Sequence, residues 1–261
     1  MGLFDAFERK NCDVCGEKVG LLGGTKLKDG RLCKKCAAKL SPWISGLRGF
    51  TLEDIDRHLA EREENLEVVR NFNITHVVGN GYTKLYIDLD NQLAVITSNS
   101  NWRSSNPDVF RFSQLVSCDM NIHETETELK QKDPEGKEVS YNPKRFEYSY
   151  NFNVTLNVNS EWYNTVTFRM NNSTVKGFDN DQYDKYYLAC EEMCEVIYAL
   201  IGGDRDDIEE TIAYYKKLAA QTSVKYDSSY YTRTSYRTVG RGSRDQNYYR
   251  QRDPRSNHYR F

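Results

Sequence analysis

Four cysteines near the start of the chain have the spacing of a metal site. They form two C-x-x-C pairs, Cys12 with Cys15 and Cys33 with Cys36, separated by 17 residues. Each pair can fold as a tight knuckle that directs two thiolates toward one point. Two knuckles complete a tetrahedral Cys₄ shell around Zn²⁺, which leaves no position for water or substrate. The spacing therefore predicts a structural zinc site.

The residues around these cysteines predict a small module, which we place at 1–48. Turn signals at Gly23-Gly24 and Asp29-Gly30 are typical of a hairpin between the two pairs. The second pair then begins a helix predicted over 34–40. A treble clef has this order: a knuckle, a hairpin, and then a helix that carries the second cysteine pair. A zinc ribbon, the alternative, would place that pair on another hairpin, and the lysine- and alanine-rich sequence favours the treble clef.

The composition indicates a folded core together with a polar segment. Of 261 residues 38% are hydrophobic, and the aromatic share of 13% reflects 19 tyrosines. The formal net charge of −2 gives no overall signal for nucleic acid or membrane. Seven cysteines, four of them in metal-type spacing, indicate a reducing compartment. We find no secretory signal and no apolar run of about 18 residues, so we expect a cytoplasmic protein without a transmembrane segment.

The segment 49–71 predicts a helix that connects the module to the rest of the chain. Thr51 is a suitable N-cap, because acidic residues follow it in the first turn. Apolar residues recur at helical spacing along one stripe: Leu52, Ile55, Leu59, Leu66 and Val69. The middle of the helix, from Arg57 to Glu64, is strongly charged, and we expect it to be solvated. His58 has no recognisable partner in the sequence.

The segment 72–203 predicts an antiparallel β domain that ends in a helix. About seven strand-like stretches with short connections include a hairpin with its turn at Asp90-Asn91. A long alternating run covers 145–158, and a polar loop is predicted over 131–140. The fold class is therefore α+β, with a barrel or a sandwich as the β architecture.

Two predicted helices and a tail complete the chain. The first helix covers 179–202, with Asp179 or Asp181 as its N-cap and a glycine pair at its end. The last segment, 204–261, begins with a short helix. From residue 221 onward it holds eight arginines and one lysine against three aspartates, a formal charge of +6, and almost no aliphatic residues. We expect this tail to be disordered.

Arginine and tyrosine alternate through the tail, and this mixture suits single-stranded nucleic acid. Arginine neutralises phosphates, and tyrosine stacks on bases. Self-association through cation–π contacts and a solvated tail without a partner are the alternatives. The candidate nucleic-acid contacts are basic residues of the module and the tail: Lys26, Lys28, Arg31, Lys34, Lys35, Arg233, Arg237, Arg241, Arg244 and Arg250.

Two parts of the chain resemble known families. The first resembles a short bacterial and phage zinc-binding domain of unknown function, through Cys12-Asp-Val-Cys15-Gly, Leu27-x-Asp29-Gly30 and Leu32-Cys33-x-x-Cys36. The second, residues 72–202, is similar to a bacterial pleckstrin-homology-like module, through Leu85-Tyr-Ile-Asp88, Val95-Ile96 and Phe110-Arg-Phe112-Ser-Gln-Leu115. The first resemblance implies four cysteine ligands and no established activity. The second implies a topology only.

These features favour a non-enzymatic zinc-binding adaptor that contacts a protein partner in an intracellular bacterial or prophage system. No P-loop, nucleophile elbow, dinucleotide fingerprint or H-E-x-x-H motif occurs, so we expect no enzyme. A nucleic-acid-associated protein is the first alternative, and it gains support if the basic side chains of the module share one face. Recruitment to a membrane surface is the second. Without its +6 tail the chain carries −8, and Lys144-Arg145 is the one obvious basic pair of the β domain.

Overall fold

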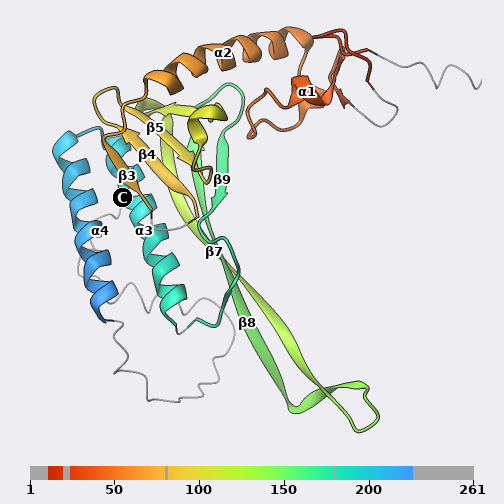
Figure 1. The fold of residues 1–261 in the computed structure, drawn as a ribbon, viewed down its shortest axis with the longest axis vertical. Coiled ribbons are helices and arrows are strands. Elements are labelled where there is room, and N and C mark those ends of the chain that lie inside the picture. Colours follow the sequence, from red (N-terminus) through yellow and green to blue (C-terminus); the bar gives the residue numbers. More distant parts are fainter. Residues whose placement is uncertain (1–10, 20–23, 80–81, 179, 226–261) are drawn as a thin grey trace, which may run out of the picture. The chain divides into compact units, whose positions relative to one another are not determined.

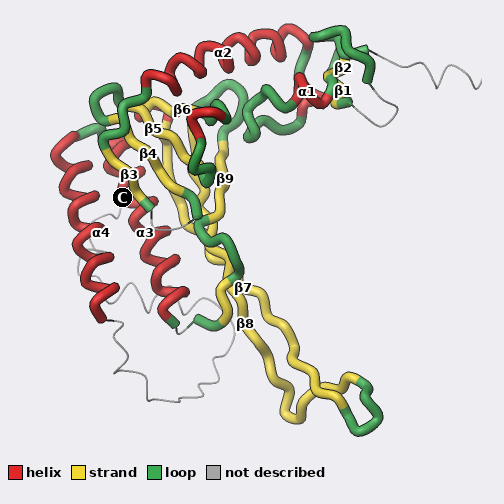
Figure 2. The backbone as a smooth tube through the Cα atoms, viewed as in Figure 1, coloured by secondary structure: helices red, strands yellow, loops and turns green. Residues whose placement is uncertain are grey.

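The chain folds into helices and antiparallel strands, whose arrangement is drawn in Figure 1 and Figure 2. The structure is a computed structural model that describes residues 11–19, 24–79, 82–178 and 180–225. Every element up to Ser223 belongs to one compact unit. The predicted mixture of helix and antiparallel sheet is confirmed within these residues.

The cysteine module, which we define as residues 11–50, contains a hairpin and a short helix. β1 (Thr25–Lys26) pairs with β2 (Arg31–Leu32), and their turn lies at the predicted Asp29-Gly30. The predicted turn at Gly23-Gly24 lies partly outside the described residues. α1 (Lys34–Ala37) is shorter than predicted, because the chain leaves the helix at Ala38 and turns Leu40 into the core of the module.

α2 (Leu52–Asn71) is the predicted connecting helix. The Oγ1 of Thr51 accepts from the N–H of Asp54, and the Asp54 carboxylate accepts from the N–H of Thr51, which forms a capping box. The sequence predicts that the charged middle of this helix is solvated. That prediction is wrong at two positions, because His58 and Arg62 are only 3% and 8% exposed. Both lie on the helix face that also buries Ile55 and Val69.

The strands after α2 form two antiparallel sheets of four strands each. The first sheet has the order β3 (His76–Val78), β4 (Lys84–Asp88), β5 (Leu93–Thr97) and β6 (Val109–Arg111). The predicted turn at Asp90-Asn91 joins β4 to β5. In the second sheet β7 (Leu115–Lys132) pairs with β8 (Glu138–Val158), and β8 also pairs with β9 (Thr165–Arg169) and β10 (Val175–Lys176).

These two sheets do not close into a barrel within the described residues, so the predicted barrel is wrong. A 3-10 turn, η4 (Phe112–Gln114), separates β6 from β7, and β7 then pairs with β8 alone. The sheets meet at one corner, where the N–H of Tyr82 donates to the carbonyl of Met170 at 2.9 Å and the hydroxyl of Thr83 donates to the carbonyl of Arg169.

β7 and β8 form a hairpin that is longer than predicted. Their register runs from Leu115 opposite Val158 to Lys132 opposite Glu138, so the predicted loop over 131–140 shrinks to residues 133–137. The Asp133 carboxylate stabilises this tight turn by accepting from the N–H groups of Glu135 and Lys137. Near the sheets the hairpin contributes buried side chains such as Phe152. Its outer part extends beyond the sheets and is mostly exposed (Figure 1).

Two long helices follow the sheets. α3 (Asp181–Gly202) packs against β7 and β8. Asn180 caps it through bonds from the N–H groups of Gln182 and Tyr183, so neither Asp179, which lies outside the described residues, nor Asp181 is the N-cap. It ends at Gly203, whose φ of 74° favours glycine. α4 (Arg205–Lys225) is longer than the short helix predicted. The rest of the predicted tail lies outside the described residues. None of the described helices combines the length and the apolar character needed to cross a bilayer.

Candidate metal centre

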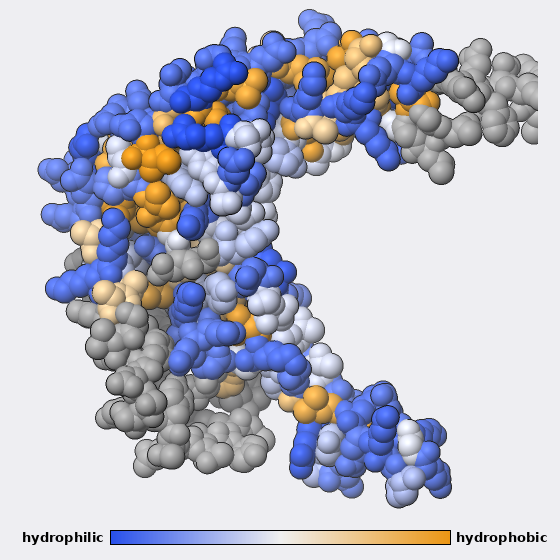
Figure 3. Space-filling view, in the orientation of Figure 1, coloured by the Kyte–Doolittle hydropathy of each residue, from blue (hydrophilic) through white to orange (hydrophobic). Residues whose placement is uncertain are grey.

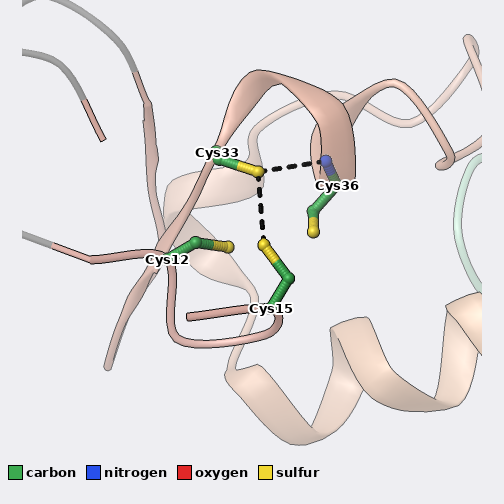
Figure 4. A group of neighbouring side chains, drawn as sticks. All are labelled: Cys12, Cys15, Cys33 and Cys36. Atoms are coloured by element: carbon green, nitrogen blue, oxygen red, sulfur yellow. Dashed lines mark hydrogen bonds between the residues drawn. The ribbon is translucent and has the colours of Figure 1, made fainter. Parts of the chain in front are cut away.

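The first cysteine pair lies in a tight turn. The N–H of Cys12 donates to the carbonyl of Glu17, and the N–H of Gly16 donates to the carbonyl of Cys12, both at 2.8 Å. Gly16 has a φ of 72°, a conformation that glycine adopts without strain. The turn directs the Sγ atoms of Cys12 and Cys15 toward the centre of the cluster (Figure 4).

The second pair lies at the start of α1. Cys33 is the N-cap of this helix, and its Sγ accepts from the N–H of Cys36 at 3.4 Å. Strand β2 brings Cys33 next to the first pair, because Asp13 and Arg31 bond to each other twice. The N–H of Asp13 donates to the carbonyl of Arg31 at 3.0 Å, and the N–H of Arg31 donates to the Asp13 carboxylate at 2.7 Å. The order of knuckle, hairpin and helix agrees with the sequence.

The geometry of the four sulfurs fits a tetrahedral metal ion. All four Sγ atoms lie within 4.8 Å of one another, and the Sγ atoms of Cys15 and Cys33 are 3.6 Å apart. Thiolates placed about 2.3 Å from Zn²⁺ at tetrahedral angles are about 3.8 Å apart. Cys15 is exposed and the other three cysteines are buried. The structure therefore brings together the four residues that the sequence identifies as ligands.

The pKa values of these thiols are also consistent with a bound cation. Burial opposes ionisation of Cys12, but hydrogen bonds from the backbone N–H groups of Cys33, Cys15 and Val14 outweigh it and lower the Cys12 pKa to about 6. Burial and the neighbouring cysteines raise the pKa of Cys36. Several thiolates this close repel one another. A divalent cation among them would remove that repulsion and deprotonate the ligands.

The basic residues of the module do not all lie together. Lys26 and Arg31 are directly opposite each other in the β1–β2 pair and so share a face. Lys28 is exposed near the hairpin turn. Lys34 and Lys35 are neighbours on α1 and so point about 100° apart, and Lys35 is paired with Glu17 at 2.8 Å. The five tail arginines proposed as contacts, Arg233, Arg237, Arg241, Arg244 and Arg250, lie outside the described residues.

The remaining cysteines belong to the core beside α3. Cys118, Cys190 and Cys194 are buried free thiols, and the Sγ atoms of Cys118 and Cys194 are 3.4 Å apart. Burial raises the pKa of Cys190. Inert buried thiols of this kind behave as small apolar side chains.

Sequence reasoning missed a buried polar cluster that links the module to the first sheet. The N–H of Ser41 donates to Nε2 of His58 at 3.1 Å, and the hydroxyl of Ser41 donates to Asp108 at 3.0 Å. Arg62 also bonds to Asp108, Nη1 to Oδ1, at 3.0 Å. Trp162, from the loop before β9, packs against His58, and the centroids of their rings are 4.7 Å apart. The i, i+4 spacing of His58 and Arg62 on the apolar stripe is the signal that could have found it.

Comparisons with known proteins address the module alone. The family described as Domain of unknown function (DUF4428) matches residues 10–58, which contain the four cysteines and the first turns of α2. No curated protein and no solved structure matches the chain. The pleckstrin-homology-like fold of 72–202 stays a prediction. Residues 10–58, which hold both C-x-x-C pairs of this chain, are thus similar to a family of unknown function.

Proposed function

We propose that this protein is a non-enzymatic adaptor whose N-terminal treble clef holds a structural Zn²⁺ and contacts a protein partner. The observation that carries the proposal is the convergence of four Sγ atoms within 4.8 Å of one another. Four thiolates fill the tetrahedral shell, so the ion has no open position for a substrate or for an activated water. Its role is then to hold the fold of the module.

The surroundings of the cysteines support a metal that stabilises the fold of the module. Cys12, Cys33 and Cys36 are part of one core with Leu32 and Ile55, so the metal would sit at the point where the hairpin, α1 and α2 meet. Zinc of this kind contributes directly to folding. The free state of all seven cysteines suits the reducing interior of a cell. We propose the β region and α3, for which the sequence predicts a pleckstrin-homology-like fold, as the second recognition element.

The first test is elemental analysis of the purified full chain and of two cysteine variants. We expect one zinc per chain in the wild type and less in Cys33→Ser. Cys190→Ala is the matched control, because it removes a cysteine outside the cluster, and it should keep its zinc. A wild-type protein without bound metal after purification in zinc-containing medium would contradict the structural zinc site.

The second test separates the adaptor from its alternative. The wild type and Cys33→Ser are used to capture proteins from lysate, with and without nuclease. The adaptor predicts the same specific proteins with and without nuclease, and their loss from the Cys33→Ser sample. Capture that disappears with nuclease would overturn it.

Nucleic-acid binding is the second candidate, because Lys26 and Arg31 form one basic face on the β1–β2 hairpin. Phosphate contacts by these two side chains would make binding strongly salt-dependent. Lys26→Glu with Arg31→Glu should then weaken binding to a single-stranded oligonucleotide by at least about tenfold, estimated from two lost phosphate contacts. Lys35→Glu is the control, since Lys35 is already paired with Glu17. Equal binding by all three proteins would exclude the module as the contact.

A further inference from the structure

The outer edge of β7 is an unpaired strand edge. In the second sheet β8 pairs with β7 on one side and with β9 and β10 on the other, so β7 is the last strand within the described residues. Residues 123–127 and 129–132 of β7 are exposed. A long free edge presents backbone N–H and C=O groups to another strand, and proteins normally block such edges. Figure 3 shows the outer hairpin as largely hydrophilic with a small hydrophobic patch.

The charges along this edge change sign at one point. Alternate side chains of a strand share a face, so one face of β7 carries Glu124, Glu126 and Glu128, followed by Lys130 and Lys132. Leu129 lies between the two groups on the opposite face, and it is 39% exposed. The irregularity at this point places its extra residues in β8, where Arg145 pairs with Leu129 and Ser140 with Lys130. The outer strand is therefore continuous across the change of sign.

Such a strand is complementary to a second copy of itself. In an antiparallel pair centred on Leu129, Glu128 lies opposite Lys130 of the second copy, and Glu126 lies opposite Lys132. The twofold axis doubles both pairs, and each Leu129 meets its own equivalent. Opposite charges directly across a strand pair are stabilising, whereas like charges are destabilising.

The alternative registers are less favourable. A pair centred on Thr127 places Glu126 opposite Glu128, and one centred on Gln131 places Lys130 opposite Lys132. A pair centred on Glu128 or on Lys130 puts that residue opposite its own copy. Leu129 is therefore the centre that pairs these four charged residues without placing like charges opposite each other.

The present partners of these side chains leave room for such pairs. Glu128 accepts from Lys144 through Oε2 at 3.2 Å, and hydrogen bonds from the side chains of Ser140 and Lys144 lower its pKa. Neither Lys130 nor Lys132 forms an ion pair with another described residue. These two lysines are therefore available to pair with Glu126 and Glu128 of a second copy.

We propose that the outer hairpin is a homodimerisation arm, in which β7 pairs antiparallel with β7 of a second copy about a twofold axis at Leu129. The dimer would contain a continuous ribbon of four strands, from β8 of one copy to β8 of the other. The twofold arrangement uses the free edge of both copies, so the assembly closes and does not grow into a fibre. This inference is independent of the metal and of the adaptor's partner.

Charge reversal tests the pairing. The full-length protein is studied by sedimentation over a range of concentrations, at low and high ionic strength. The double variant Lys130→Glu/Lys132→Glu and the double variant Glu126→Lys/Glu128→Lys should each raise the dimer dissociation constant at least about tenfold, estimated from four lost charge pairs. The variant with all four changes restores complementarity and should dimerise like the wild type. An equimolar mixture of the two double variants should form heterodimers.

A cross-link tests the register. With Leu129→Cys, the two new thiols lie directly opposite each other, at a Cβ separation of about 5 Å, and mild oxidation should give a covalent dimer. Thr127→Cys is the control, because its copies would be offset by four residues, about 13 Å along the strand, and should not cross-link. Wild-type protein reports any cross-link from the native cysteines.

Three outcomes would overturn the proposal. The first is a wild type that stays monomeric at every concentration in low salt. The second is a dimer that neither double variant weakens while circular dichroism shows them folded. The third is equal cross-linking at positions 127 and 129.

Discussion

The cysteine module and the sheet region differ in what holds each of them together. Three of the eight buried residues of the module core are cysteines, and the others are Val19, Leu27, Leu32, Leu40 and Ile55. The sheet region has fully buried large apolar side chains: Leu85, Ile87, Phe152, Leu156, Met170, Met193 and Ile197. Apolar burial stabilises by about 25 cal/mol per Å², and small units bury too little to fold without a metal or a cross-link. The comparison implies that the proposed metal would supply most of the module's stability.

Helix α2 contributes to both regions. Ile55 packs into the module core, whereas Val69 packs with Phe72 and Trp102 in a second cluster beside the first sheet. Loss of the metal would therefore free the first half of the helix from its packing but leave the second half in place. The boundary between the two regions is expected within α2, near the point where Arg62 bonds to Asp108.

Removal of one ligand is the strongest way to break this comparison. Cys33→Ser should release the zinc and unfold residues 12–58, because structural zinc contributes on the order of 10 kcal/mol to the folding of such modules. Strands β4, β5 and β8 should keep their protection. Hydrogen exchange read by mass spectrometry, with zinc analysis on the same sample, measures both effects.

The control and the contrary outcome are equally direct. Cys190→Ala should keep both its zinc and the protection of the module, although it alters a buried cysteine. If β8 loses protection together with the module in Cys33→Ser, then the two regions unfold as one cooperative unit, and the comparison fails.

A cavity-creating mutation in the sheet region tests whether the module keeps its metal when the sheet region is destabilised. The side chain of Phe152 is 0% exposed and lies against the rings of Tyr183 and Tyr186. Phe152→Ala should lower the free energy of unfolding by about 3–5 kcal/mol, while the folded protein keeps its zinc. Phe146→Ala is the matched control, since Phe146 lies on the same strand and is 40% exposed. Denaturant unfolding read by circular dichroism compares the two, and similar losses would show that position 152 is not a core site.

Breaking the link between the regions should have a similar or smaller effect. The Arg62 and Asp108 side chains are each 10% exposed, and Asp108 also accepts from the hydroxyl of Ser41. Asp108→Ala leaves the buried Arg62 guanidinium with the carbonyl of Asn106 but without its charged partner, at a cost of about 3 kcal/mol. Arg62→Met together with Asp108→Leu should recover most of this loss, because no charge stays buried.

An exposed ion pair provides the control for that link. Asp90 pairs with Arg205 at 3.0 Å, and both side chains are more than half exposed. Asp90→Ala should lower the free energy of unfolding, measured by thermal unfolding, by about 0.5 kcal/mol or less. Equal destabilisation by Asp90→Ala and Asp108→Ala would mean that the buried bond does not connect the regions.

The sequence was sufficient where one local pattern decides the structure. The two C-x-x-C pairs identified the four converging cysteines, and Thr51 followed by acidic residues identified the start of α2. It was insufficient where distant partners decide. The charge of Arg62 suggested solvation, but Asp108, 46 residues away, makes its burial tolerable. The alternation of β7 and β8 showed two strands but not that they pair far beyond the sheets, because turn residues at 133–137 also suit a longer loop.

Apart from the Asp90→Ala control, the smallest expected effect is a dependence on pH at His58. Burial, and then the nearby Arg62 cation, lowers the pKa of His58, although Asp108 opposes this. In the unfolded chain the pKa is about 6.5. Above that value the histidine is neutral in both states. As the pH falls through it, the unfolded state binds a proton first, so the free energy of unfolding falls by at most about 1.4 kcal/mol per pH unit until the folded pKa is passed. His58→Gln, whose amide oxygen can still accept from Ser41, should lack this loss. Thermal unfolding from pH 7.5 to 5.5, with zinc content checked at each pH, compares the two proteins. Parallel curves would place the pH dependence in other groups and leave His58 a structural acceptor only.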